Sequence, residues 1–232
     1  MILCIETATN VCSVALCDEN RVVSLREQKD GKAHSSLLTV YIKEILDGQK
    51  ICARDLQAVA VSKGPGSFTG LRIGVSVAKG IAYGTGIPLI GIDTLTSLFH
   101  GVLPIAREKN LINEHTLFCP MIEAKRMEVF YCIFNSAGER IKDICTETIT
   151  DRTFINITGG ETMVFFGDGA DKCSHFFTHE RQIYISNITA SASFMHIPAM
   201  EALKERRFEN TAYFEPFYLK DFITTKPKRK VI

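Results

Sequence analysis

The segment 63–74, KGPGSFTGLRIG, has the residue types of a phosphate-binding turn: four glycines and a proline directly before an expected helix. Glycine-rich turns at a helix start bind phosphates because free backbone N–H groups point at the ligand. A P-loop also needs Gly-Lys-Ser/Thr there, and this segment continues as Gly-Leu-Arg. The dinucleotide-binding pattern is also missed, because Gly64, Gly66 and Gly70 are spaced two and four residues apart. The segment therefore predicts at most weak anion binding.

A second group of polar residues follows the first expected strand, ILCIE, in the turn ETATN. A carboxylate at a strand end beside a hairpin turn could hold Mg²⁺ or a phosphate-bound water. However, close approach of a phosphate usually needs a glycine in the turn, and this turn has none. The alternative is that the turn's own N–H groups satisfy the carboxylate. The candidate residues for a weak anion or nucleotide site are Glu6, Thr7, Thr9, Gly64, Gly66 and Ser67.

The expected helix 69–83 has little polar surface on either side. One face has glycines one turn apart, which allow a close approach to a sheet: Gly70, Gly74, Val77 and Ile81. The opposite face has two charged residues among small and apolar ones: Arg72, Ser76, Lys79 and Tyr83, flanked by Val75 and Ala82. Such a helix is usually buried on both sides. Its second cover is either the preceding helix of this chain or a partner protein.

Other catalytic patterns are weak. His175 and His179 are spaced as metal ligands on a helix would be, but no third ligand accompanies them, and we predict no metal site. The GDGA turn at 167–170, together with Glu6, leaves an active ATPase or kinase as an alternative. A peptidase has less support, because Ser67 is not in a G-x-S-x-G elbow and no H-E-x-x-H motif occurs. We therefore assign no catalytic residue.

The composition is that of a soluble globular protein, with 46% hydrophobic residues and a net charge of +1. The eight cysteines form no C-x-x-C pair and suit a reducing compartment. No signal peptide or membrane-spanning run is expected, which predicts a cytoplasmic protein. Four of the residues in KPKRK, at 226–230, are basic and could contact phosphates or form a solvated end.

The order of predicted elements repeats along the chain. Three strands in 2–27 precede a helix at 34–47, a strand, the helix 69–83, a strand, and a helix capped by Asp93 that ends or kinks at Pro104. A similar series follows, and its last helix, about 191–207, contains Pro198. We predict two similar α/β lobes, 1–106 and 107–222, with mixed sheets flanked by helices and a basic tail at 223–232. The helix at 191–207 could pack back on the first lobe.

Several blocks together resemble the TsaB (YeaZ) family: MILCIETATNVCSVAL, GPGSFTGLRIGVSVAKGIA, IPLIGIDTLTSL, PMIEAKRMEVFY and FEPFYLKDF. They occur in the family's order and span residues 1 to about 222. The family usually has Asp where this chain has Glu6. The resemblance implies an actin-like fold of two ribonuclease-H-like lobes, which agrees with the repeat of elements.

The resemblance also implies a role in making threonylcarbamoyladenosine on tRNAs, beside the anticodon. TsaB-like proteins resemble the catalytic subunit TsaD, with which they are expected to pair as non-catalytic scaffolds, and the ATPase TsaE joins the complex. ATP and metal would then be bound by partner subunits and tRNA reached through the complex, with a homodimer when the partner is absent. Pairing uses the two helices of the first lobe, so the interface residues would be Leu38, Tyr41, Ile42, Ile45, Arg72, Val75, Ser76, Lys79 and Tyr83.

Overall fold

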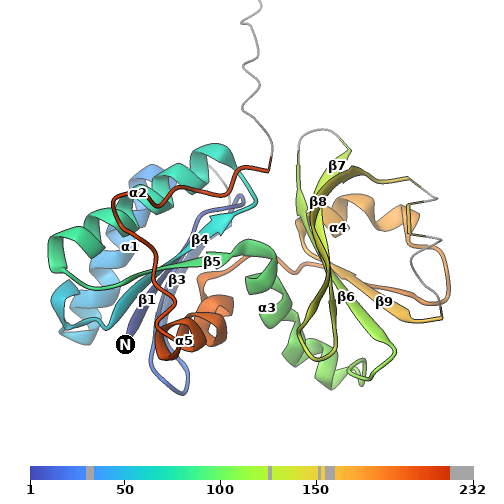
Figure 1. The fold of residues 1–232 in the computed structure, drawn as a ribbon, viewed down its shortest axis with the longest axis horizontal. Helices are drawn as coiled ribbons and strands as arrows, with labels where there is room; N and C mark the ends of the chain where they lie inside the picture. Colours follow the sequence, from blue (N-terminus) through green and yellow to red (C-terminus); the bar gives the residue numbers. More distant parts are fainter. Residues whose placement is uncertain (30–33, 125–126, 151–152, 155–159, 220–232) are drawn as a thin grey trace, which may run out of the picture.

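Two five-stranded mixed sheets lie side by side and form two lobes (Figure 1). The structure, a computed structural model, describes residues 1–29, 34–124, 127–150, 153–154 and 160–219. The basic tail predicted at 223–232 lies outside this range. Among the described residues, no helix has the length and apolar character needed to cross a membrane.

The first sheet has the strand order β3-β2-β1-β4-β5. Its strands are β1 (Ile2–Glu6), β2 (Cys12–Cys17), β3 (Val22–Gln28), β4 (Ala58–Gly64) and β5 (Leu89–Asp93). The first three form the predicted antiparallel meander, whereas β1, β4 and β5 run parallel. Residues of β1 alternate between two cores, with Leu3 and Ile5 on one face and Ile2 and Cys4 on the other. Both faces are therefore buried, which explains the continuous apolar run.

Helices α1 (His34–Gln49) and α2 (Phe68–Thr85) cover one face of this sheet, and the short helix η1 (Ala53–Asp55) precedes β4. The hydroxyl of Ser67 caps α2 by accepting a hydrogen bond from the Gly70 N–H. Gly86 ends α2 in the left-handed conformation that favours glycine. Both helices lie where the apolar spacing predicted them.

The second sheet repeats the first, with the order β10-β9-β6-β7-β8. Its strands are β6 (Thr116–Glu123), β7 (Glu128–Asn135), β8 (Arg140–Thr148), β9 (Thr162–Phe166) and β10 (Gln182–Ile185). Strands β6, β7 and β8 are antiparallel, while β6, β9 and β10 are parallel. The short helices α4 (Asp168–Cys173) and η2 (Ser174–Phe176) follow β9. The predicted pair of similar lobes with mixed sheets is confirmed.

The lobes exchange helices. Helix α3 (Thr94–Glu108) begins at the Asp93 cap, as predicted, but it packs on the second sheet through residues such as Leu98 and Phe99. Helices η3 (Ala192–Met195) and α5 (His196–Lys204) pack on the free face of the first sheet. The helix expected at 191–207 thus lies against the first lobe. The chain therefore passes from the first sheet to the second core at Asp93, where β5 ends and α3 begins. The predicted boundary between the lobes was placed later, at residue 106.

One local expectation changes, at Pro104. Helix α3 continues through Pro104 to Glu108, because the proline removes a single backbone donor and α3 is anchored by apolar packing on both sides of it. His175 and His179 do not share a helix face, since η2 ends at Phe176, so their spacing is not that of metal ligands on a helix.

Candidate functional site

The glycine-rich turn before α2 packs directly on the turn after β1. The Ser67 N–H donates to the Ala8 carbonyl at 2.6 Å, and the Thr7 hydroxyl donates to the Gly70 carbonyl at 2.8 Å. A Cβ added at Gly66 or Gly70 would overlap the carbonyl oxygen of Ala8 or Thr7. The glycines therefore allow two backbones to touch, and the helix start is closed by the chain itself.

The N–H groups of the β1–β2 turn are also engaged within the chain. The Thr7 N–H donates to the Ser62 hydroxyl at 3.3 Å, and the Ala8 N–H donates to Glu6 Oε1 at 2.6 Å. The Thr9 hydroxyl accepts from the Val11 N–H at 3.3 Å. The residues predicted for an anion site are thus brought together, but they bind one another. This geometry favours the alternative in which the turn satisfies the Glu6 carboxylate.

Glu6 is fully buried, and its Oε2 atom has no hydrogen-bond partner in the described part of the chain. Burial raises the pKa of Glu6 to about 7, against the lowering effect of hydrogen bonds from Ala8, Ser62 and Thr7. The carboxylate of Asp168, from the second lobe, raises this pKa further. Burial likewise raises the pKa of Asp168 to about 6. Two carboxylates with weakened acidity therefore interact across the junction of the lobes.

These carboxylates do not amount to a metal centre in the residues that the structure describes. No group of three or more His, Cys, Asp or Glu side chains is arranged there to hold an ion. Glu123, the last residue of β6, forms an ion pair with Lys172, with 3.0 Å between the carboxylate oxygen and the ammonium nitrogen. Asp168 was not among the predicted residues; its position in the GDGA turn was the available signal.

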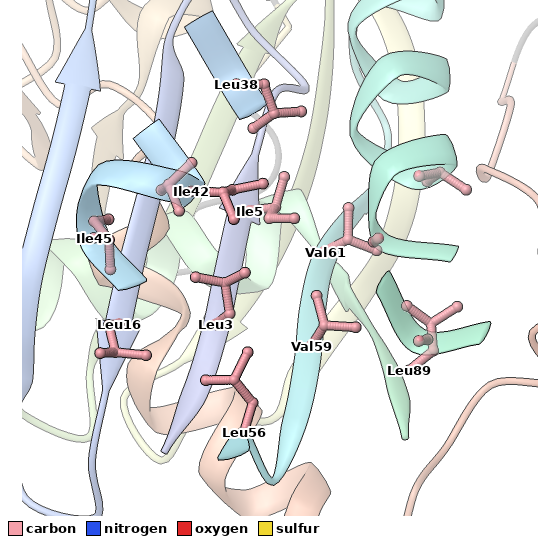
Figure 2. Packing of buried hydrophobic residues seen from close by; sticks show 14 of the residues in the cluster. Leu3, Ile5, Leu16, Leu38, Ile42, Ile45, Leu56, Val59, Val61 and Leu89 are labelled. Carbon is pink, nitrogen blue, oxygen red and sulfur yellow. The ribbon is translucent and has the colours of Figure 1, made fainter. Parts of the chain in front are cut away.

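Four residues predicted for a partner interface belong to the chain's own core. Leu38, Ile42 and Ile45 point from α1 onto the first sheet, beside Leu3 and Ile5 (Figure 2). Val75 is buried in the same cluster. Their side chains cannot meet a partner without unpacking this core, so this part of the prediction is corrected. The helical spacing identified an apolar face but could not say which surface it met.

The face of α2 against the sheet is also rotated relative to the prediction. Leu71, Gly74, Val75, Ala78 and Ala82 are buried, whereas Val77 and Ile81 are partly exposed. Five apolar side chains of α1 and α2 are partly buried and pack against this core, and they are here termed the seam: Leu37, Tyr41, Ile73, Val77 and Ile81. Beside the seam are exposed residues of α2: Ser76, Gly80, Tyr83 and Gly84.

Gly80 and Gly84 differ from the glycines at the start of α2. Apart from the chain neighbours and the nearby backbone of α2 itself, no atom lies within 4 Å of the position that a Cβ would take at either residue. Glycine costs a helix up to about 1 kcal/mol relative to alanine, and nothing in the described part of this chain requires it at these two sites. The sequence does not single these two out, because all glycines of the helix look alike without tertiary contacts.

The other edge of α2 is covered by the C-terminal segment 208–219, here termed the strap (Figure 1). The Lys79 ammonium donates to the carbonyls of Ala212 and Phe214, at 3.2 and 2.9 Å. Arg72 Nε donates to the Tyr218 hydroxyl at 3.2 Å. Of the remaining predicted interface residues, Arg72 and Lys79 therefore contact the strap, while Tyr41, Ser76 and Tyr83 lie at or beside the seam. The second cover of α2 includes a segment that neither sequence alternative named.

Two lobes of one topology, with exchanged helices, define an actin-like fold of ribonuclease-H-like lobes. A solved structure from Pseudomonas aeruginosa, described as an uncharacterized protein with similarity to peptidase YEAZ, superposes with a TM-score of 0.77. The superposition covers 94% of this chain and 99% of that chain at 22% identity, which shows a shared fold.

The sequence comparisons identify the family. Residues 27–224 match the model of TsaD, described as tRNA N6-adenosine threonylcarbamoyltransferase. The TsaB protein of Buchnera aphidicola from Acyrthosiphon pisum, described as a tRNA threonylcarbamoyladenosine biosynthesis protein, is 34% identical over 71% of this chain and 73% of its own length. The Haemophilus influenzae TsaB protein is 26% identical over 97% of this chain and 95% of its own length. The chain belongs to the TsaB family.

Proposed function

We propose that this protein is a non-catalytic subunit in tRNA threonylcarbamoyladenosine biosynthesis, and that its α1–α2 seam pairs with the equivalent helices of a TsaD-type subunit. The observation that supports pairing is the exposed glycine pair of α2. Gly80 and Gly84 leave room for the close approach of another helix, beside apolar side chains that are only partly buried. A partner helix would bury the seam and compensate for the glycines.

Two features support a non-catalytic role. Three N–H groups at the β1–β2 turn, those of Thr7, Ala8 and Val11, already donate to Ser62, Glu6 and Thr9. The start of α2 is likewise closed by Ala8. We therefore assign ATP and metal to the partner subunits, with TsaE as the ATPase and tRNA bound through the complex. Without the catalytic partner, a second copy of this chain would cover the same seam.

The test measures complex mass by light scattering after mixing the chain with TsaD-type and TsaE-type subunits and ATP. Gly80→Leu places a large side chain in open space, so the isolated chain should stay folded while pairing weakens more than about 30-fold through steric exclusion. Gly48→Leu is the matched control, because a Cβ at Gly48 would also meet no atom outside the neighbouring turns of its own helix, but Gly48 lies at the C-terminal end of α1.

Normal pairing by Gly80→Leu would refute the seam as the interface. Failure of the unmodified chain to form any complex at micromolar concentrations would refute the scaffold role itself. The same substitution should weaken self-association, which sedimentation of the chain alone would measure.

An ATP-binding function is the second candidate, because Glu6 Oε2 is buried, has no hydrogen-bond partner among the described residues and interacts with Asp168 across the lobes. Calorimetry of the isolated chain with ATP and Mg²⁺ would decide between the two. Millimolar or tighter binding that Glu6→Gln abolishes would favour this function, and no detectable heat would exclude it.

A further inference from the structure

A cleft with a volume of about 560 Å³ lies between the two lobes and the strap. The first lobe contributes Lys63 and Asp93, at the carboxyl ends of the parallel strands β4 and β5. The second lobe contributes Arg140 and Ile144 of β8, and the strap forms the third wall. Small molecules commonly bind outside the carboxyl ends of parallel strands and in clefts of this volume between lobes. The cleft therefore has the position and the size of a ligand site.

The charged side chains of this cleft do not suit a phosphate. Three carboxylates and two cations line it: Asp93, Glu209, Glu215, Lys63 and Arg140. Each cation already lies beside a carboxylate, with 3.0 Å between nitrogen and oxygen for Arg140 and Asp93 and 3.7 Å for Lys63 and Glu209. With three negative charges against two positive ones, the lining has a net charge of −1. This charge disfavours a ligand with several phosphates.

Both kinds of charged group keep unused hydrogen-bonding capacity. In the described part of the chain, the Lys63 ammonium donates no hydrogen bond, because its distance of 3.7 Å from Glu209 is too long for one. The Arg140 guanidinium donates from Nη2, to Asp93 and Thr96, and from neither of its other side-chain nitrogens to any described side chain. Glu215 is exposed, and no cation of the described residues lies within ion-pair distance of it. The cleft therefore offers free donors together with a free carboxylate.

The strap and β8 also give the cleft an apolar surface. Tyr213 and Phe217 line it while 83% and 43% exposed, and Ile144 lies at the same cleft. Such rings can cover the apolar part of a ligand, and the face of an aromatic ring also attracts an ammonium group. The first core needs only Phe214 of the strap, whose ring is buried there. The exposed rings are thus left available to a ligand.

The strap wall is held in place by contacts with the first lobe. The Phe217 N–H donates to the Lys63 carbonyl at 2.7 Å, and the Glu209 N–H donates to the Leu89 carbonyl at 2.8 Å. Both bonds join main-chain atoms, so a change of the Lys63 side chain leaves them intact. The cleft is therefore formed before any ligand arrives, which lowers the entropic cost of binding.

We propose that this cleft binds a zwitterionic ligand of the amino-acid type, either a free α-amino acid or a short peptide. The ligand carboxylate would accept hydrogen bonds from Lys63 and Arg140, and its ammonium would donate to Glu215. Its side chain would lie against Phe217 and Ile144. A ligand with one charge of each sign uses both kinds of free group and leaves the net charge of the cleft unchanged, which an anion or a cation alone does not.

This site is separate from the function proposed above and does not rest on it. None of the seam residues lines the cleft, and Glu6 and Asp168 do not line it either. Binding can therefore be measured on the chain alone, without a partner subunit or a nucleotide.

The test follows amide NMR shifts of the isotopically labelled full chain during titration with phenylalanine and with the dipeptide alanyl-phenylalanine. We expect saturable shifts that concentrate at the cleft, with a dissociation constant of about 1 mM or lower for the better ligand. Two analogues each lack one charge: N-acetylphenylalanine has no ammonium, and phenylalanine amide has no carboxylate. Each should bind at least about tenfold more weakly than phenylalanine. Tighter binding of phenylalanine would identify a free amino acid as the ligand, and tighter binding of the dipeptide would identify a peptide.

Substitutions in the cleft should separate the two charges. Glu215→Gln should weaken phenylalanine binding about tenfold, but N-acetylphenylalanine should bind this variant as it binds the unmodified chain. Lys63→Gln should likewise weaken phenylalanine about tenfold and leave phenylalanine amide unaffected. Glu180→Gln and Lys43→Gln are the matched controls, because both residues are exposed and neither lines the cleft. The amide spectrum of each variant also reports whether it stays folded.

Three results would overturn the proposal. The first is the absence of saturable shifts with either zwitterion at about 20 mM, well above the expected dissociation constant. The second is equal binding of phenylalanine and its two singly charged analogues. The third is that folded Glu215→Gln and Lys63→Gln variants bind phenylalanine as the control variants do.

Discussion

The two lobes share a strand order and a glycine turn, but the helix after that turn differs threefold in length. Gly64, the last residue of β4, and Gly167, directly after β9, have positive φ values of 113° and 103°. Helix α2 then runs for 18 residues, while α4 runs for 6. In both lobes the glycines of this turn and of the following helix start lie in close contact with backbone atoms at or just after the end of the first strand of that sheet, β1 or β6. The turn is thus part of the fold, and the long helix is the feature particular to the first lobe.

The two lobes also differ at the last residue of their first strand, which is Glu6 in β1 and Glu123 in β6. Glu6 is fully buried, and burial raises its pKa, whereas Glu123 is exposed and paired with Lys172. Equivalent carboxylates on equivalent strands therefore have different electrostatics. Topology places the side chain, and the neighbours on adjacent elements set its charge.

The largest effects should come from removing the glycines that both lobes need. Gly66→Ala and Gly169→Ala each force a Cβ against backbone atoms, of Ala8 in one lobe and of Met121 and Ile122 in the other. Each substitution should cost about 3 kcal/mol of unfolding free energy, measured by urea denaturation. Gly80→Ala is the control with open space, and it should gain about 1 kcal/mol. Equal small losses at all three positions would show that the turns are not tightly packed.

The second largest effect should be a pH-dependent change in unfolding free energy when Glu6 is replaced, which is not expected for Glu123. The pKa of Glu6 is raised from 4.5 to about 7 by burial, so the folded state holds its proton more tightly than the unfolded state. Its stabilising contribution is complete below pH 4.5 and is lost as the pH rises through about 7. Glu6→Gln should therefore add about 3 kcal/mol at pH 8 relative to its effect at pH 4.

Urea unfolding of the unmodified chain and of the Glu6→Gln variant, each at pH 4 and pH 8, would measure this change. Some pH dependence should remain in the variant, because burial also raises the pKa of Asp168 to about 6. An identical difference between variant and unmodified chain at pH 4 and pH 8 would contradict the raised pKa.

A third, smaller effect concerns the junction of the lobes. Asp93 caps α3 by accepting from the N–H groups of Leu95 and Thr96, and it pairs with Arg140 of the second lobe at 3.0 Å. Asp93→Ala should cost about 1–2 kcal/mol, because two helix donors lose their acceptor. Arg140→Gln leaves the cap intact but removes the charge pair, the hydrogen bond to the Thr96 hydroxyl and the contact with the Phe134 ring, and it should cost less than about 1 kcal/mol. Calorimetric melting would compare them, and equal losses would mean that the ion pair stabilises the junction more than the cap does.

The smallest effect should be at Glu123. Its ion pair with Lys172 is partly exposed, and such pairs contribute about 0–1 kcal/mol. Glu123→Gln should therefore change the unfolding free energy by less than about 0.5 kcal/mol at any pH between about 5 and 8, which urea unfolding would measure. A change as large as that of Glu6→Gln would mean that the two carboxylates are equivalent after all.

The strands, the two helices of the first lobe and the repeat of the lobes could be predicted from the sequence, because apolar periodicity is a local signal. The Asp93 cap was readable for the same reason. The packing of α3 on the second sheet was not, because an amphipathic helix shows that it has a buried face without naming the surface that buries it. Leu38, Ile42, Ile45 and Val75 were misassigned to an interface on this account.

By itself the sequence determined the family, the order of elements and the absence of P-loop chemistry in KGPGSFTGLRIG, since each depends on residue identities at short spacing. Only the tertiary structure distinguished Gly66 and Gly70, which touch another backbone, from Gly80 and Gly84, which have open space around them. It alone brought Tyr218 to Arg72 and Asp168 toward Glu6. Contacts between residues far apart in the chain depend on how faces and lobes meet, and no local pattern encodes that meeting.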